Sequence, residues 1–473
     1  MNETVALPVW LLAVLVALAS WAALERLLLP GVRWFFRRRV NRVIEEVGAR
    51  LHIELPSFKL TKRQVLIDRL LFDPKVQQAA EAISQEQRIP RAVVMAQVAR
   101  YAREIVPSFN AYLYFRIGYS LAKGIARLLY RVRLGYTDSA GLNAIDPKST
   151  VVFVMNHRSN MDYVLVAFLA AERVALSYAV GEWARIWPLQ TLIRSMGAYF
   201  VRRNSSDPLY RMVLQRYVQM ATEAGVCQAV YPEGGLSVDG KLRKPKYGLL
   251  DYMLKGFDPH GERDLVFIPV GINYDRTLED RTQQIKLDPE AKSRGPAFAA
   301  YTTLKFMLKN LRLMAAGRWH RFGYACVNFG TPVSMRAYCQ QLEHDFRSLS
   351  QEQRFTEVAQ LTQELMGAIS RVIPALPVPL VATAFVHEPQ RSFSVLELKS
   401  AAGLLMSRLE SAGGKLYIPR RDQDYAISVG LRHLVLRRLV VEQEGLYSAN
   451  PGELQALAYY ANSIQHLFQT SQA

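Results

Sequence analysis

Residues 151–169 read VVFVMNHRSNMDYVLVAFL, and this stretch decides how the middle of the chain folds. Its first five residues are apolar, as in a buried strand, and an apolar stretch resumes after the polar segment. That polar segment is NHRSNMD, residues 156–162, which holds an imidazole, a guanidinium and a carboxylate. Asn, Ser and Asp are typical of helix starts, so we predict a strand, a short polar turn and a helix.

The spacing of His157 and Asp162 limits how the two side chains can meet. On one continuous helix, residues five apart point about 140° away from each other. They meet if His157 lies in the turn and Asp162 in the first turn of the helix. The carboxylate can then bond one ring nitrogen and leave the other as a base. In the alternative interpretation, Ser159 or Asn160 only caps the helix and His157 is a solvated loop residue.

The wider region, residues 136–345, alternates short apolar runs with helical stretches. The apolar runs are TVVFVM, ALSYAV, AYFVRR, CQAVYP, LVFIPVGINY and YACVNFG. Such alternation predicts an α/β domain with a central mixed sheet. A further long helix is expected over 297–317. In open α/β sheets, ligands bind beyond the carboxyl ends of the strands, so polar groups that follow the runs are candidate site residues.

Three more segments place polar or glycine residues after such runs. They contribute Arg202 and Arg203, then Glu233, Gly234, Gly235, Ser237, Lys241, Arg243 and Lys244, and finally Pro269 within the strand 266–275. Cations around a glycine-rich turn with free N–H groups suit a phosphate. Each segment alone also fits an ordinary strand end, turn or basic loop, so only the ordered set is specific.

In this order, NHRSNMD, GAYFVRR, YPEGG with DGKL, and IPVGINY resemble the four blocks of the glycerolipid acyltransferases. The resemblance is strongest to the large membrane-bound glycerol-3-phosphate acyltransferases of bacteria and their dihydroxyacetone-phosphate relatives. VNFGTPVSM, residues 327–335, resembles a segment that such enzymes carry after block four. The resemblance extends over about 60–460, with strong motifs only between 156 and 275.

The resemblance implies an acyltransferase that moves a fatty acyl group from a thioester of coenzyme A or acyl carrier protein to the sn-1 hydroxyl of glycerol 3-phosphate. The product would be lysophosphatidic acid, in the first step of phospholipid biosynthesis, with no cofactor or metal. His157 and Asp162 would be catalytic, and the polar residues named above would bind substrate. Backbone N–H groups near the start of the 161–172 helix are candidate oxyanion donors.

One position departs from the family pattern. Block three usually reads Glu-Gly-(Gly or Thr)-Arg-Ser, and here Leu236 stands where the family has the Arg that helps hold the acceptor phosphate. Lys241, Arg243 or Lys244 are candidates to replace that charge. The alternative is a different acceptor, either dihydroxyacetone phosphate or a lysophospholipid.

The N-terminal region points to a membrane. Residues 6–24 contain no charge and would span roughly 28 Å as a helix, close to the hydrocarbon thickness of a bilayer. Five arginines between 33 and 42 follow, which predicts that the rest of the chain lies in the cytoplasm. We expect a transmembrane anchor at 1–30, in the cytoplasmic membrane, and a helical region at 31–135. A cleaved signal peptide is the rival interpretation, but the leader MNET lacks a positive charge.

The C-terminal region, residues 346–473, is predicted to be helical and winged-helix-like, after a linker at PALPVP (374–379). Lys and Arg number 59 and Asp and Glu 41, which gives a net charge of +18 and favours anionic substrates or an anionic membrane. A membrane-tethered nucleic-acid-binding protein is the alternative from another class, but it leaves the histidine segment unexplained. Three scattered cysteines argue against a disulfide framework or a structural zinc site.

Overall fold

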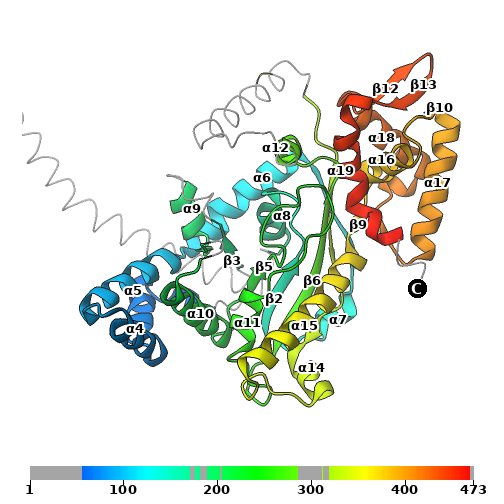
Figure 1. Cartoon of the computed structure of the whole chain (residues 1–473). Helices are drawn as coiled ribbons and strands as arrows, with labels where there is room; N and C mark the ends of the chain where they lie inside the picture. Colours follow the sequence, from blue (N-terminus) through cyan, green and yellow to red (C-terminus); the bar gives the residue numbers. More distant parts are fainter. Residues whose placement is uncertain are drawn as a thin grey trace, which may run out of the picture.

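A computed structural model of the chain describes residues 56–170, 176–181, 189–202, 205–285, 312 and 319–468. In this part of the chain the central feature is a mixed sheet of eight strands in the order β1-β7-β6-β2-β5-β3-β4, with β8 paired to β6 (Figure 1). The strands are β1 (Arg131–Thr137), β2 (Thr150–Met155), β3 (Ser177–Val180), β4 (Tyr199–Phe200), β5 (Gln228–Val230), β6 (Leu265–Tyr274), β7 (Tyr324–Phe329) and β8 (Val333–Ser334). The pairs of β6 with β7 and β8 are antiparallel and the other pairs are parallel. The six predicted strand runs are therefore confirmed.

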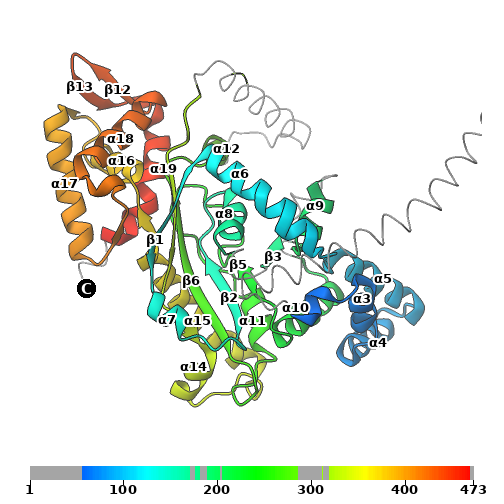
Figure 2. The ribbon, with the colours of Figure 1, turned by 180° about the vertical axis from the view of Figure 1, so that it is seen from behind.

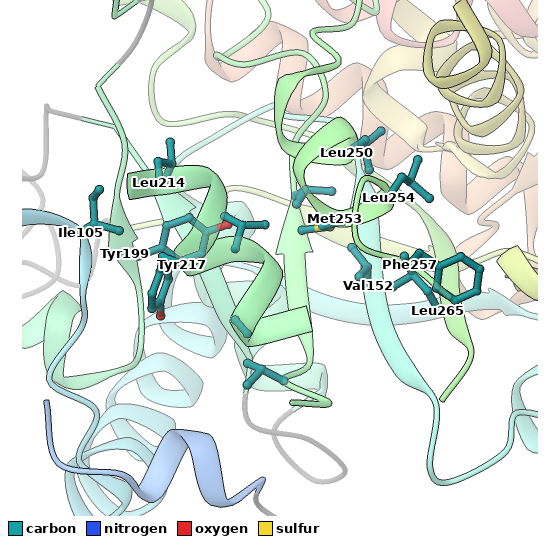
Figure 3. Close-up of a cluster of buried hydrophobic side chains, with 14 of the residues drawn as sticks. Ile105, Val152, Tyr199, Leu214, Tyr217, Leu250, Met253, Leu254, Phe257 and Leu265 are labelled. Carbon is teal, nitrogen blue, oxygen red and sulfur yellow. The ribbon is translucent and has the colours of Figure 1, made fainter. Parts of the chain in front are cut away.

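Helices cover both faces of this sheet. Successive side chains of a central strand point to opposite faces, so each face has its own apolar core. Val152 and Val154 belong to the core under α10 (Pro208–Glu223), α11 (Gly248–Leu254) and α15 (Gln351–Val372). Figure 3 shows part of that core. Phe153 and Met155 face the other core, under α6 (Tyr119–Leu129) and α8 (Met161–Ala170). A strand buried on both faces is typically apolar throughout, as β2 and β6 are except for Thr150 and Asn273.

The region before the sheet is helical, as predicted. It contains α2 (Ser57–Leu60), α3 (Arg63–Leu71), α4 (Pro74–Gln87), α5 (Arg91–Ile105) and the π-helical turn η1 (Leu113–Gly118). Asp73 caps α4 by accepting from the amides of Lys75 and Val76. The group α3–α5 lies at one end of the molecule beside α10 (Figure 2). The strand β1 crosses the expected boundary at 135/136, because its residues pair with β7 rather than extend α6.

Four shorter helices lie between the elements named so far in the described part of the chain. They are α7 (Ser139–Asn143), α9 (Leu189–Ser195), α12 (Asp280–Ile285) and α14 (Met335–Leu342).

The C-terminal region is mainly helical and has its own core. Its elements are β9 (Pro374–Ala375), α16 (Pro377–His387), β10 (Ser392–Phe393), α17 (Val395–Ser411), β11 (Lys415–Leu416), η3 (Pro419–Arg421), α18 (Gln423–Leu436), β12 (Val440–Gln443), β13 (Leu446–Ala449), η4 (Pro451–Glu453), α19 (Leu454–Gln465) and η5 (His466–Phe468). The apolar helix α16 lies at its centre, against α17, α18 and α19. The prediction of a linker at 374–379 is wrong. These residues form β9 and the first turn of α16 and are buried, since proline at the first helical positions favours a helix start.

Some expectations concern parts of the chain outside the described residues. These are the anchor at 1–30, residue Arg203 and, except for residue 312, the helix at 297–317. Among the residues that are described, no helix combines the length and apolar character needed to cross a bilayer.

Candidate active site

The turn between β2 and α8 begins where the Asn156 side chain replaces the backbone pairing of β2. After Met155 the strand pairing with β6 is continued by the Asn156 side chain, which donates to the carbonyl of Ile272 and accepts from its amide, both at 2.8 Å. Because the amide group takes the place of a peptide, the backbone is free to leave the sheet at His157. The helix α8 begins at Met161, so the predicted order of strand, polar turn and helix is present.

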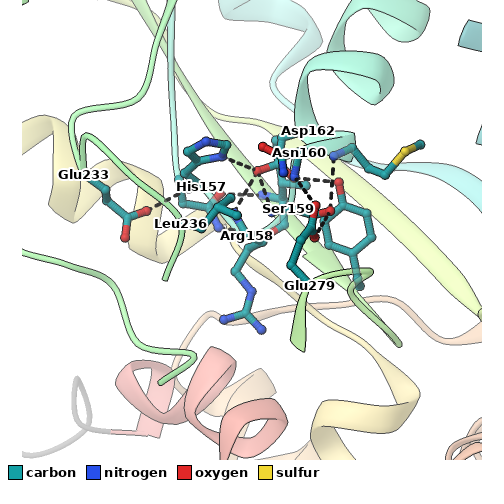
Figure 4. Close-up of polar contacts among 12 residues, drawn as sticks. His157, Arg158, Ser159, Asn160, Asp162, Glu233, Leu236 and Glu279 are labelled. Atoms are coloured by element: carbon teal, nitrogen blue, oxygen red, sulfur yellow. Dashed lines mark hydrogen bonds and ion pairs between the residues drawn. The ribbon is translucent and has the colours of Figure 1, made fainter. Parts of the chain in front are cut away.

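His157 and Asp162 are in contact. The ring Nδ1 lies 2.9 Å from Asp162 Oδ2, and both side chains are buried, with 2% and 0% exposure (Figure 4). His157 lies in the turn and Asp162 in the first turn of α8, the geometry that the spacing predicted. A carboxylate on Nδ1 fixes the tautomer in which Nδ1 carries the proton and Nε2 accepts one.

Asp162 is a hub with three further donors. Its Oδ2 accepts from the amides of Arg158 at 2.7 Å and Ser159 at 3.1 Å, and its Oδ1 accepts from Tyr274 Oη at 2.6 Å. Burial and the carboxylate raise the pKa of the Tyr274 hydroxyl well above its usual value, so it stays a donor. The four donors together hold this carboxylate in one orientation.

The N–H groups at the start of α8 are already occupied. Besides the two amides that bind Asp162, the amide of Asn160 donates to Glu279 at 3.0 Å and that of Met161 to Ser159 Oγ at 3.1 Å. Their expected role as oxyanion donors is therefore not supported by this geometry.

An aromatic cluster surrounds the imidazole. The ring of Tyr231 lies 4.2 Å from that of His157 at an interplanar angle of 32°, and the ring of Tyr163 lies 5.4 Å away, edge on. Tyr163 also contacts Tyr178 of β3 at 5.1 Å. These rings limit rotation of the imidazole and exclude water from one side of it. Sequence reasoning missed them, although Tyr231 directly precedes the PEGG turn.

Glu233 connects two loops of the site. Its Oε1 accepts from the amide of His157 and its Oε2 from the amide of Arg243, both at 2.8 Å. Burial raises the pKa of this carboxyl to about 7, against the two amides, which lower it. Glu233 thus orders the 233–243 loop around His157, with Gly234 supplying a backbone φ of +63° that favours glycine.

Ser237 closes the same loop. Its amide donates to the carbonyl of His157 at 3.0 Å, its hydroxyl donates to the carbonyl of Lys241 at 2.7 Å, and the hydroxyl accepts from the amide of Gly240 at 3.0 Å. The structure therefore brings Glu233, Gly234, Gly235 and Ser237 to His157.

Glu279, which follows β6, is a site residue that sequence reasoning missed. Its Oε2 accepts from Ser159 Oγ at 2.7 Å and its Oε1 from the amide of Asn160. Burial raises the pKa of this carboxyl. Figure 4 shows it on the opposite side of the turn from Glu233. No local motif marks Glu279, since its partners lie about 120 residues earlier.

The candidate phosphate ligands are arranged differently. Arg202, directly after β4, is paired through Nε at 2.8 Å and Nη2 at 2.6 Å with Glu104 of α5. Its guanidinium also lies over the rings of Tyr101 and Tyr210, so much of it is already occupied. On the 233–246 loop, Lys241, Arg243 and Lys244 are exposed.

Two further positions concern the neighbours of these cations. Arg243 Nη1 lies 3.2 Å from the carbonyl of Leu236, the residue that replaces the family arginine. Pro269 lies within β6, opposite Val154, and its carbonyl accepts from the amide of Gly330 at 2.8 Å. In the described part of the chain, no three His, Cys, Asp or Glu side chains gather as metal ligands would.

Comparison with known proteins assigns most of the chain. Residues 137–273 match the family described as Acyltransferase, and residues 310–471 match the one described as Glycerol-3-phosphate acyltransferase C-terminal region. The glycerol-3-phosphate acyltransferase of Pseudoalteromonas atlantica is 26% identical over 447 residues, which cover 90% of this chain and 53% of that protein. The protein of the same name from Pseudomonas putida is 25% identical over 428 residues, covering 86% and 49%.

The chain spans about half the length of these relatives. Among solved structures, the 1-acyl-sn-glycerophosphate acyltransferase of Thermotoga maritima is similar with 16% identity and a TM-score of 0.31, over 64% of this chain and 97% of that one. The two sequence families match successive parts of the chain, and the first covers the His157 turn. The chain therefore belongs to the glycerol-3-phosphate acyltransferase family, with an acyltransferase domain followed by that family's C-terminal region.

Proposed function

We propose that this chain transfers a fatty acyl group from an acyl thioester to the sn-1 hydroxyl of glycerol 3-phosphate, giving lysophosphatidic acid. The observation that carries this proposal is the buried His157–Asp162 pair at the start of α8, in a family whose relatives bear this activity in their names. A base of this kind suits removal of a proton from an alcohol. The reaction opens phospholipid synthesis.

In the proposed mechanism, the acceptor hydroxyl binds at Nε2 of His157. As its oxygen attacks the thioester carbonyl, the proton passes to Nε2 and Asp162 stabilises the imidazolium. The carbon–sulfur bond then breaks, and the proton on Nε2 goes to the departing thiolate. No acyl-enzyme is needed, because a thiolate is a good leaving group and the sequence has no GxSxG motif.

For the phosphate of the acceptor, we propose Lys241, Arg243 and Lys244 as the main contacts. Their loop is tied to His157 through Glu233 and Ser237, and their side chains are exposed. Arg203 stays a proposed contact, while Arg202 would contribute only if its pair with Glu104 opens. Gly234, Gly235 and Pro269 act through backbone shape rather than by charge.

The remaining assignments are also proposals. We propose an anchor at 1–30 that holds the chain in the cytoplasmic membrane, a helical region at 31–135, the acyltransferase domain at 136–345 and the C-terminal region at 346–473. The apolar run at 6–24 and the arginines after it support the anchor. The C-terminal element order, with a three-stranded sheet β10-β13-β12 beside α16, α17 and α18, supports a winged-helix-like interpretation.

The test offers radiolabelled acyl-coenzyme A and acyl carrier protein thioesters to the full chain, with glycerol 3-phosphate, dihydroxyacetone phosphate or a lysophospholipid as acceptor. We expect lysophosphatidic acid from glycerol 3-phosphate. Preference for another acceptor would overturn the substrate assignment and point to Leu236 as the cause. Absence of transfer to all three would overturn the function.

The catalytic assignment is tested by His157→Ala and Asp162→Asn. Loss of the base should lower kcat by about 10²–10⁴-fold, with a smaller loss for the Asn variant. His260→Ala, on an exposed loop, is the matched control and should retain activity. Wild-type turnover by the His157 variant would show that the base lies elsewhere.

A further inference from the structure

The helix α19 of the C-terminal region lies directly against the loop that carries the candidate phosphate ligands. Gly240 has a φ of +92°, and a Cβ there would come within 2.0 Å of the carbonyl oxygen of Tyr459. Next to it, the side-chain amide of Asn462 donates to the carbonyl of Asp239 at 2.9 Å. Backbone therefore packs on backbone, and only glycine fits at position 240.

Arg158 reinforces this contact from the side of the histidine turn. The residue is buried, with 3% of its surface exposed, and Nη1 donates to the carbonyl of Gly240 at 2.6 Å. Its guanidinium lies 4.7 Å from the ring centroid of Tyr459. Figure 4 shows the side chain leaving the turn on the side away from the imidazole, toward the helix.

These are the two direct contacts of the Arg158 guanidinium that the described residues show. Its Nε and Nη2 have no hydrogen-bond partner among the described residues. A buried cation that no carboxylate pairs with directly is unfavourable unless other groups compensate for the lost water. The face of the Tyr459 ring supplies that compensation through a cation–π contact, and the Gly240 carbonyl fixes its direction.

The residue that contacts α19 directly precedes a residue of the proposed acceptor site. Gly240 precedes Lys241, whose carbonyl is bound by Ser237, and the amide of Ser237 is bound to His157. Displacement of the 239–241 turn would therefore move the cations relative to the base. The base itself would be unaffected, because the Arg158 backbone amide, and not its side chain, binds Asp162.

We propose that α19 packs against the acceptor-binding loop and holds it in place. Arg158, stacked on Tyr459, is then a positioning residue that sets the affinity for the phosphorylated acceptor. This inference rests on the proposed function. It assigns to the C-terminal region a part in substrate recognition, through a residue adjacent to the histidine that never touches the reacting atoms.

The kinetic test uses Arg158→Lys, which keeps the charge but loses the planar stacking group, and Tyr459→Leu, which removes the ring. We expect the KM for glycerol 3-phosphate to rise by about tenfold in each. The kcat and the KM for the acyl thioester should stay within about twofold. Equal changes in all three constants would overturn the positioning role.

Matched variants separate this contact from general loss of stability. Leu405→Ala weakens the core of the same C-terminal region without touching the loop, so its KM for the acceptor should stay at the wild-type value. Gly240→Ala should raise that KM more than Gly445→Ala. Both glycines have positive φ, but a Cβ at 445 meets no atom within 4 Å.

A second readout is independent of activity. Hydrogen exchange measured by mass spectrometry should show faster exchange of residues 233–246 in Arg158→Lys and Tyr459→Leu, but not in Leu405→Ala. Unchanged exchange in this loop would overturn the inference even if the chain acylates glycerol 3-phosphate. Faster exchange in a chain that lacks this acyl transfer would instead retain the support role and reject only the proposed function.

Discussion

Asp162 accepts four hydrogen bonds, and only the one from His157 follows from the spacing in the sequence. The two amide donors follow once the strand–turn–helix order is assumed, because a carboxylate in the first turn of a helix accepts from nearby N–H groups. The hydroxyl of Tyr274 could not be predicted, since it lies 112 residues later and reaches Asp162 only through the pairing of β2 with β6.

We expect Tyr274→Phe to lower kcat by about tenfold and leave both KM values unchanged. The variant removes a hydrogen bond to a buried charged group, and such bonds contribute roughly 1.5–3 kcal/mol. Asp162 would then hold the imidazole less firmly. Steady-state kinetics checks this, with Tyr130→Phe as the control. Tyr130 lies beside Tyr274, but its hydroxyl donates to the carbonyl of Arg276. A normal kcat for Tyr274→Phe would show that the other three donors suffice.

Arg202 shows that a sequence motif does not reveal which partner a charged side chain binds. The GAYFVRR segment predicts a phosphate ligand at Arg202, and the sequence contains no local sign that Glu104 would occupy its guanidinium. Glu104 belongs to α5, in the N-terminal helical region, and only the packing of that region near β4 brings the two together. Side-chain identity is visible in the sequence, whereas the partner of a partly buried cation depends on tertiary contacts.

Elements were predicted well where burial and pattern agree. Five of the six apolar runs form inner strands, which are apolar because both of their faces are buried, and the sixth forms the edge strand β4, whose two residues are also buried. The edge strand β1 was missed for the opposite reason. Arg131, Arg133 and the exposed Leu134 give a mixed pattern that continues the basic helix before it. At the other end, the prolines of 374–379 suggested a linker, but Pro377 and Pro379 occupy the first turn of α16, where proline is tolerated.

Two helical glycines of the C-terminal region should respond oppositely to alanine. Gly403, inside α17, has no atom within 4 Å of a would-be Cβ, so Gly403→Ala should stabilise the protein by about 0.5–1 kcal/mol. Gly430 lies where α18 crosses α16, and a Cβ would come within 2.5 Å of the Pro377 carbonyl. Gly430→Ala should therefore destabilise it. Urea denaturation followed by circular dichroism compares the two. Stabilisation by both substitutions would indicate that α18 and α16 can move apart at Gly430 without loss of stability.

At the scale of the whole molecule, the order of elements was readable and their arrangement was not. The sequence indicates helices, then alternating strands and helices, then helices again. It does not indicate that β7 inserts between β1 and β6, parallel to the first and antiparallel to the second, or that α19 returns to the turn after β2. Both depend on pairing between segments far apart in the chain, and no local propensity encodes the identity of such partners.

Asp275 links the sheet to the C-terminal region, and we expect its contribution to the stability of the fold to depend on pH. Its carboxylate accepts from the amide of Tyr324 in β7 at 2.7 Å and from that of Val378 in α16 at 2.9 Å. Burial raises the pKa of this carboxyl from 3.8 to about 7. A group that binds its proton more tightly when folded stabilises the fold fully below its unfolded pKa, and this stabilisation is lost as pH rises through about 7.

We therefore expect the free energy of unfolding of the wild type, relative to Asp275→Asn, to fall between pH 4 and pH 8 by on the order of a few kcal/mol. The difference is the informative quantity, because other groups titrate in both proteins and cancel. Urea denaturation at several pH values measures it. If the difference between the wild type and Asp275→Asn is instead the same at every pH, the carboxylate is solvated and the contact between the sheet and α16 is open to water.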